Sequence, residues 1–347
     1  MRMNVTGWVS ACVLVIAMAC GVFALGWGAL GRVPAPQRDE YHLEGPFTQG
    51  NLSVFLVHGT DKIKGQTFIT LQEALVQKKV IVRETREVNE LSIENVSGEE
   101  VYVQSGDIVK GGQQDRMLVV DLILPPHSGI IPIAAFCVEN GRWSRRGNEE
   151  VTTFTSSANV VASREVKLAA KEKGSQSEVW SQVAAAQDKL SANTGGSVRS
   201  ASSPTSFQLA LENKSVQTSA DSYVKALSGI IDGKSDVIGY VFAINGKINS
   251  ADIYASNALF RKLWPKLLQA SAIEAVAELR RGEKFDAPKP TEVEGFLADG
   301  TKGEEQQKEV SGRVQMVTRD SKDNVSFDTR DRAKSNVVVH RNIIKKN

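Results

Sequence analysis

Residues 237–248 read VIGYVFAINGKI. The first eight of them carry no charge and are followed directly by Asn245-Gly246. A run of this length, rich in β-branched and aromatic residues, is typical of a buried strand. Asn-Gly readily supplies the positive φ angles of a tight turn, and a β-like segment resumes at Lys247-Ile248. We therefore expect this segment to lie inside the main sheet of the protein.

Short β-like runs separated by turn residues fill the part of the chain before this segment. They are Leu52–Val57, Val80–Arg83, Leu91–Asn95, Val101–Gln104, Met117–Leu124 and Ile130–Val138, with one short helix at Leu71–Gln77 and a hairpin turn at Gly98-Glu99. This spacing predicts antiparallel sheet.

After Ser163 the apolar residues recur three and four positions apart, which predicts helices. The expected helices are Arg164–Lys173 and Glu178–Leu190, and then Asn257–Leu268 and Ser271–Arg281 as one or two helices. Ser163 is expected to cap the first, and Asp252 and Asn257 are candidate caps later. β-like pieces follow at Arg313–Thr318, Asn324–Phe327 and Asn336–Ile344. The serine-rich residues 191–206 have low hydrophobicity and no period, and predict an exposed loop.

These patterns predict an α+β fold. A mostly antiparallel β N-terminal half is followed by helices packed on the sheet and by a C-terminal β segment, in a single domain over residues 41–347.

The N-terminal segment Trp8–Leu30 carries no charge and lies between Arg2 and Arg32. Its length predicts a transmembrane anchor within residues 1–32, followed by a linker at 33–40. A cleaved signal peptide ending near Ala17-Met18-Ala19 and a lipoprotein acceptor at Cys20 are the alternatives. Each places the body of the protein outside the cytoplasm, secreted or attached to a membrane.

The charged residues give little preference for a partner, because 42 basic and 40 acidic residues leave a net charge of +2. We expect no nucleic-acid partner. Cys137 is the one cysteine outside the N-terminal segment, which excludes an intradomain disulfide. The four histidines show no zinc spacing, so no metal and no cofactor is expected.

The stretch 105–116 (SGDIVKGGQQDR) combines a glycine pair with donors and acceptors. Adjacent glycines let backbone N–H groups converge on an anion, and two cations lie beside them. The candidate ligand-binding residues are Lys110, Gly111, Gly112, Gln113, Gln114, Asp115 and Arg116. The alternative is a glycine-bearing connection between strands whose polar residues satisfy one another.

A second constellation, 137–143 (CVENGRW), ends a β-like run in an Asn-Gly turn and presents Glu139, Arg142 and Trp143. Arginine clamps carboxylates and phosphates, tryptophan offers a stacking face, and the carboxylate can exchange a proton. The alternative is an internal Glu139–Arg116 or Asp115–Arg142 ion pair that fixes a loop. Cys137 is expected in the core, and His127 at the surface.

Together with GYVFAINGK (239–247), ADIYAS (251–256) and LFRKLWPKLL (259–268), these two constellations resemble the ARG and Rhodanese-Phosphatase-superfamily-associated protein domain family. The resemblance extends from about Tyr41 to the C-terminus. It implies association with ADP-ribosylglycohydrolase-like and rhodanese/phosphatase-like proteins, and no particular activity.

The leading functional hypothesis is an exported, membrane-tethered binding module, in which the 106–116 loop and the 139–143 turn bind a small anionic or polar ligand or a peptide. One alternative is a hydrolase that uses Asp107, Asp115 or Glu139 as acid or base, with an arginine stabilising negative charge. The other is a structural or protein-interaction scaffold. A carboxylate of this inferred site with a strongly raised pKa inside a concave pocket would favour the enzyme, and satisfied ion pairs at the surface would favour the scaffold.

Overall fold

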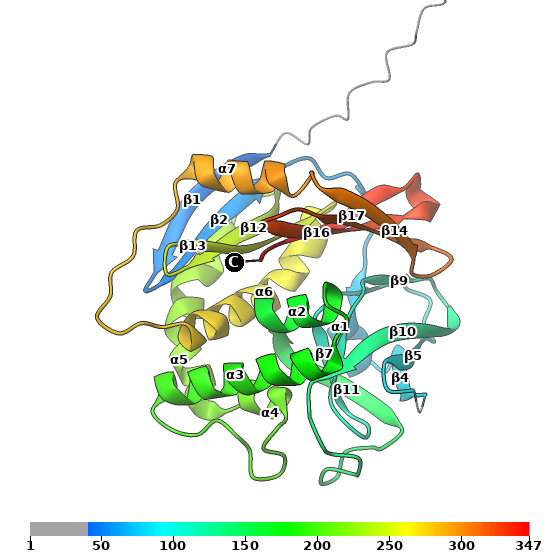
Figure 1. Cartoon of the computed structure of the whole chain (residues 1–347). Helices are drawn as coiled ribbons and strands as arrows, with labels where there is room; N and C mark the ends of the chain where they lie inside the picture. The colour runs from blue at the N-terminus through cyan, green and yellow to red at the C-terminus, as the bar shows by residue number, and fades with distance from the viewer. Residues whose placement is uncertain (1–40, 86, 347) are drawn as a thin grey trace, which may run out of the picture. The chain divides into compact units, whose positions relative to one another are not determined.

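The computed structural model describes residues 41–85 and 87–346, which fall in one compact unit over residues 40–347. Its largest sheet is antiparallel, with strand order β1-β2-β12-β13-β17-β16-β15-β14 (Figure 1). The strands are β1 (His42–Gln49), β2 (Leu52–His58), β12 (Val237–Ile244), β13 (Lys247–Tyr254), β14 (Glu304–Glu309), β15 (Val314–Asp320), β16 (Asn324–Asp331) and β17 (Val337–Lys345). Strands from both ends of the chain therefore meet on either side of the β12–β13 hairpin.

The expectation for residues 237–248 is confirmed. All eight residues of β12 are buried, and the register pairs Ile244 with Lys247 across the turn. Asn245 and Gly246 adopt φ angles of 52° and 73°. A side chain at Gly246 would place its Cβ 2.6 Å from the carbonyl oxygen of Asp286, so glycine is required there by space as well as by conformation.

Helices cover both faces of the sheet. One face, with Val54 and Leu56 of β2, packs on α5 (Lys214–Leu227) and α6 (Asn257–Ala277). The alternate β2 residues Phe55 and Val57 pack on the other face, under α7 (Pro290–Asp299). Because successive strand residues point to opposite faces, burial on both sides explains why β12 and residues 54–57 of β2 are apolar without interruption.

The first half of the chain also forms a closed barrel, with strand order β10-β5-β4-β11-β7-β8, and a separate three-stranded sheet β3-β6-β9. The barrel strands are β4 (Val80–Glu84), β5 (Glu90–Asn95), β7 (Asp107–Gly111), β8 (Arg116–Leu118), β10 (Gly129–Cys137) and β11 (Thr153–Val161); the others are β3 (Ile69–Thr70), β6 (Val101–Val103) and β9 (Leu122–Leu124). The remaining helices are α1 (Leu71–Val76), α2 (Arg164–Lys171), α3 (Gln176–Thr194) and α4 (Phe207–Leu211), with the 3-10 turns Ser228–Ile231 and Arg332–Lys334.

The α+β class, the antiparallel first half, the helices packed on a sheet and the C-terminal β segment are all confirmed. The expectation of a simple loop over 106–116 was wrong, because residues 107–111 form strand β7. The run 117–124 is two strands, since β8 joins the barrel and β9 joins the small sheet. The expected hairpin at 98–99 was also wrong, because β5 and β6 pair in different sheets.

The helix caps around α6 differ from the prediction. Ser256 is the N-cap, and its hydroxyl accepts from the backbone N–H of Leu259 at 3.4 Å. Asn257 instead donates through Nδ2 to the carbonyl oxygen of Val237 at 2.6 Å. Asp252 lies in β13 and binds a buried histidine. Ser163 is the N-cap of α2 by position but makes no side-chain cap hydrogen bond.

The N-terminal predictions for residues 1–32 and 33–40 fall outside the described residues. Within the described part of the chain, no helix combines the length and the apolar character that a membrane crossing requires.

A buried ionic network connects the small sheet to the largest one through His340 of β17. The imidazole Nδ1 lies 2.7 Å from Oδ2 of Asp121, and Nε2 lies 3.0 Å from Oδ1 of Asp252. Ionised carboxylates only accept hydrogen bonds, so both ring nitrogens carry protons and the ring is an imidazolium. Burial alone would lower the pKa of His340, but Asp121 and Asp252 raise it to about 9.

This geometry predicts that stability decreases as pH rises above 6.5. The unfolded histidine loses its proton near pH 6.5, whereas the native one keeps it to about pH 9. Between pH 6.5 and 8 the free energy of unfolding should therefore fall by about 2 kcal/mol. Urea denaturation at both pH values measures this change. His340→Gln should lose most of it and keep the smaller part that comes from Glu274, whose pKa is raised to about 7.

The pH range ends at 8 because burial lowers the pKa of Lys171 to about 8, and its proton release then works in the opposite direction. His127→Gln is the matched control, since His127 is exposed as expected. An equal pH dependence in wild type and His340→Gln would show that His340 is not the titrating group.

Candidate functional site

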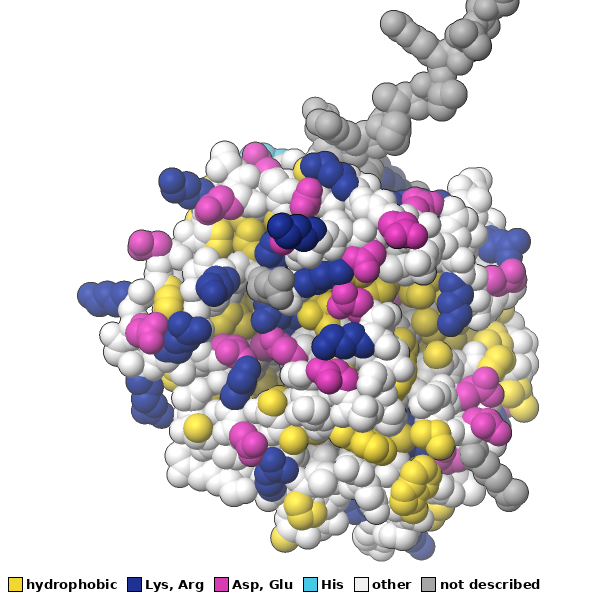
Figure 2. Space-filling view, in the orientation of Figure 1, with side chains coloured by type: hydrophobic (Ala, Val, Ile, Leu, Met, Phe, Trp, Pro, Cys, Tyr) yellow, Lys and Arg dark blue, Asp and Glu magenta, His cyan; other side chains and the backbone are white. Residues whose placement is uncertain are grey.

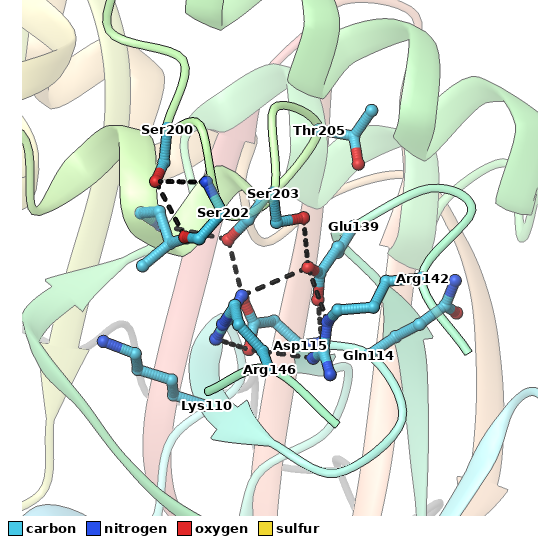
Figure 3. Close-up of polar contacts among 12 residues, drawn as sticks. Lys110, Gln114, Asp115, Glu139, Arg142, Arg146, Ser200, Ser202, Ser203 and Thr205 are labelled. Carbon is cyan, nitrogen blue, oxygen red and sulfur yellow. Dashed lines mark hydrogen bonds and ion pairs between the residues drawn. The ribbon is translucent and has the colours of Figure 1, made fainter. Parts of the chain in front are cut away.

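The two constellations singled out in the sequence do meet in space, around two fully buried carboxylates (Figure 3). Asp115 follows β7 and receives Arg146 in a bidentate pair, from Nη1 to Oδ2 and from Nη2 to Oδ1, each at 2.8 Å. The hydroxyl of Ser206 donates to Oδ2 at 2.7 Å, and the backbone N–H of Gly111 donates to Oδ1 at 3.1 Å. Asp115 is thus an anion enclosed by the chain itself.

Glu139, after β10, is the second carboxylate. Its Oε1 accepts from Nε of Arg142 at 2.7 Å and from Nη1 of Arg146 at 3.1 Å, and also from the hydroxyl of Ser203. Its Oε2 accepts from the backbone N–H of Asp115 at 2.9 Å. Burial raises the pKa of Glu139, but the bonds from Arg142 and Ser203 outweigh it and hold the pKa below its usual value.

The serine-rich segment forms part of this group, which corrects the expectation of an exposed loop over 191–206. Helix α3 continues to Thr194, and Val198, Ser203 and Ser206 are buried. Ser206 has two roles, because its hydroxyl also accepts from the backbone N–H of Leu209 and so caps α4. The polar contacts therefore fix the position at which α4 begins.

The glycine pair adopts the conformations that a glycine-rich turn requires, with φ angles of 120° at Gly111 and 55° at Gly112. Its backbone N–H groups bind groups of the same chain. Gly111 donates to Asp115, Gly112 to the carbonyl oxygen of Glu150, and Gln113 to Oε1 of Glu84. The acceptors that we expected from an external anion are thus supplied by the protein.

Arg116 lies apart from these carboxylates, with a side chain that is 1% exposed. Its Nη1 donates to Oε1 of Gln114 at 3.0 Å and to Sγ of Cys137, and its Nη2 lies 3.5 Å from Oε2 of Glu84. Burial raises the pKa of Cys137, although Arg116 opposes the shift. Cys137 is buried, as expected for a core residue, and its thiol is not activated.

The other candidates are placed as follows. Asp107 forms an ion pair with Lys266 of α6 and takes no part in the group around Asp115. Lys110 pairs with Glu212 at 2.7 Å, from Nζ to Oε2. Trp143 is 54% exposed. Arg142 and Asp115 do approach, at 3.8 Å, as the internal-pair alternative proposed, but Glu139 pairs with Arg142 and Arg146 and not with Arg116.

Arg146, Ser203 and Ser206 were not identified from the sequence. For Ser206 a signal existed, because a serine directly precedes the apolar stretch Phe207–Leu211. For Arg146 there was no signal, since nothing in the sequence distinguishes it from its neighbour Arg145, which is exposed. No group of three or more His, Cys, Asp or Glu side chains in the described residues is arranged to hold a metal ion.

A second feature is an apolar cleft beside this group. It lies between β11, the start of α2, and helices α3, α4 and α6, and its volume is about 30 Å³. Its apolar walls include Val161, Ala186, Phe207, Leu211, Ala270 and Ile273. It opens at α3, where Ala186 is half-buried and Lys189 is exposed. Three glutamates also line it, Glu165, Glu274 and Glu278, and of these Glu274 is the buried one.

The two features are connected through α4. The hydroxyl of Ser206 binds Asp115 and caps the helix, and the N–H of Phe207 donates to the carbonyl oxygen of Val138 at 3.0 Å. Phe207 and Leu211 then form one wall of the cleft. The buried carboxylate therefore determines where that wall lies.

Fold and site together define an α+β protein with a large antiparallel sheet and a closed barrel, in which buried carboxylates bind arginines of the barrel loops and the serine that begins α4. The chain belongs to the ARG and Rhodanese-Phosphatase-superfamily-associated Protein domain family, whose model matches residues 40–346. Searches of curated proteins and of solved structures find no match.

The contacts around Asp115 predict that Arg146→Ala is strongly destabilising. Removing the guanidinium takes both charge-assisted bonds from buried Asp115, whose nearest remaining cation is Arg142 at 3.8 Å, and this costs about 3 kcal/mol or more. Arg145→Ala is the matched control, because Arg145 is exposed and makes one long hydrogen bond, to the carbonyl oxygen of Asn148 at 3.4 Å. We expect it to change the free energy of unfolding by less than about 0.5 kcal/mol.

Urea denaturation of both variants measures the difference. Equal stability of the two would mean that water satisfies the carboxylates when Arg146 is absent, and that they are not enclosed.

Proposed function

We propose that this protein is an exported binding module, held at a membrane by its N-terminal segment, and that its ligand occupies the apolar cleft between α3, α4 and α6. The observation that carries the proposal is a cleft with apolar walls that opens to solvent and contains one buried carboxyl, that of Glu274. Concave apolar sites with few polar groups are the usual form of a small-molecule site.

The volume of the cleft limits what enters it. About 30 Å³ is more than a single water requires, and far below the 300 Å³ or more of a site that encloses a whole drug-sized ligand. We infer that a narrow apolar group enters the cleft while the rest of the ligand stays at its mouth.

The polar group around Asp115 and Glu139 supports this function by bracing α4. That its residues bind a polar or anionic ligand directly stays a prediction, and their contacts with one another favour the bracing role. The hydrolase alternative has less support, because a general acid at neutral pH requires a raised pKa and that of Glu139 is lowered.

The mixed surface charge also points to a ligand chosen by shape and local chemistry. Basic and acidic side chains are interspersed over the face drawn in Figure 2, as the net charge of +2 suggests. Long-range attraction of a strongly charged partner therefore contributes little.

Methyl-labelled alanine gives a direct test of the cleft, because Ala185, Ala186, Ala270 and Ala277 line it. With hexanol as a neutral probe, we expect saturable shifts of these methyl resonances. The methyl group of Ala74, buried in the barrel core, should not shift.

Ala186→Leu should fill the cleft and abolish the shifts of the other lining alanines. Ala192→Leu is the matched control on the same helix, because Ala192 is exposed and does not line the cleft. Shifts that spread over the core alanines, or that persist in Ala186→Leu, would refute the cleft as a binding site.

A further inference from the structure

Glu274 is the most unusual group in the cleft. It lies on α6 with 8% of its surface exposed, although the walls around it are largely apolar. Its Oε1 accepts from Nδ2 of Asn249 at 2.6 Å, and its Oε2 accepts from the backbone N–H of Arg164 at 3.3 Å. Each oxygen has capacity for a further hydrogen bond, because a carboxylate oxygen accepts about two.

Two cations near Glu274, Arg164 and Lys189, are paired with other carboxylates, whereas buried Lys167 forms no ion pair within the described residues. Arg164 binds Glu165 at 2.7 Å, and Lys189 binds Glu278 at 2.5 Å. Within the described residues no ion pair to Glu274 is present, although Arg164 and Lys167 influence it from a distance. Burial and the charge of Glu165 raise the pKa of Glu274 to about 7.

Resting on the proposed function, we propose that the cleft binds a primary amine attached to an apolar chain, with the ammonium group at Glu274 and the chain against Ala186 and Ala270. Three glutamates and one lysine line the cleft, and Glu274 is the glutamate among them that has no ion pair in the described part of the chain. A cation is therefore attracted and a fatty carboxylate is repelled.

The geometry also favours an amine over a neutral alcohol. An ammonium group has three donors, and the free lone pairs of the Glu274 carboxylate accept them in a charge-assisted bond. Such a bond is about twice as strong as a neutral one, and burial among apolar walls strengthens it further. The ammonium supplies the direct ion pair that no described residue makes to Glu274.

The direction of the pH dependence follows from the two charged groups that amine binding requires, a protonated amine and an ionised Glu274. An alkylammonium, like a lysine side chain, stays protonated up to about pH 10. It requires ionised Glu274, which forms as pH rises through about 7. The charged groups near Glu274 are Glu165, Arg164 and Lys167 of α2, and Glu278 and Lys189 at the mouth of the cleft.

The test is calorimetric titration of the whole protein with hexylamine, hexanol and hexanoate at pH 5.5 and 8.5. The ratio of the hexylamine affinity to the hexanol affinity is compared, so that general effects of pH on the fold cancel. We expect this ratio to be about tenfold larger at pH 8.5 than at pH 5.5. Hexanoate should bind more weakly than hexanol at pH 8.5.

Glu274→Gln keeps the size of the side chain and removes its charge, so the preference for hexylamine and its pH dependence should both disappear. Glu178→Gln is the matched control, because Glu178 lies on α3 outside the cleft and pairs with Lys173. The wild-type pH series needs no variant, so the proposal stays testable if Glu274→Gln folds poorly.

The outcomes separate the two proposals. If hexanol binds and hexylamine shows no preference at pH 8.5, or if Glu274→Gln keeps the preference, the amine assignment is wrong and the cleft remains a binding site. If none of the three probes binds and the lining alanine methyl groups do not shift, the cleft is not a site and both proposals fail.

Discussion

The buried carboxylate of Asp115 is the constraint on which this structure depends most visibly. A carboxylate without exposed surface is costly to remove from water unless it is paired and fully hydrogen-bonded. Its partners, Gly111, Arg146 and Ser206, come from three separate segments of the chain. The contact that satisfies the charge therefore also fixes these segments relative to one another, and through Ser206 it fixes the start of α4.

A second buried charge, that of His340, also fixes separate segments of the fold relative to one another. His340 lies on β17 between Asp121 and Asp252, so one imidazolium connects the small sheet to the largest one. Apolar layers alone tolerate small displacements, because burial of apolar surface has no direction. Hydrogen-bonded charges do not, since a shift of an ångström leaves a buried group unpaired. The two ionic groups therefore fix the relative positions of the segments that they join, which apolar packing alone does not fix.

The comparison of the polar group with the cleft bears on function. Around Asp115 and Glu139, carboxylates and guanidinium groups satisfy one another and the pKa of Glu139 is lowered, as in a structural support. In the cleft, Glu274 has a raised pKa, apolar neighbours and no ion pair among the described residues. Strained electrostatics of this kind is typical of a binding or reactive group. The polar motifs around Asp115 and Glu139 are thus less available to a ligand than Glu274 in the cleft.

The sequence by itself determined the α+β class, the β12–β13 hairpin and most strand positions, because hydrophobic periodicity and Asn-Gly turn chemistry act over a few neighbouring residues. It also led to the hypothesis that the segments containing Asp115 and Glu139 form one site. Only the tertiary structure decided that β7 closes a barrel, that Arg146 and Ser206 neutralise Asp115, and that Glu274 lies in a cleft. Those outcomes depend on contacts between residues distant in sequence, where register and burial select one arginine over its neighbour, and no local pattern encodes that selection.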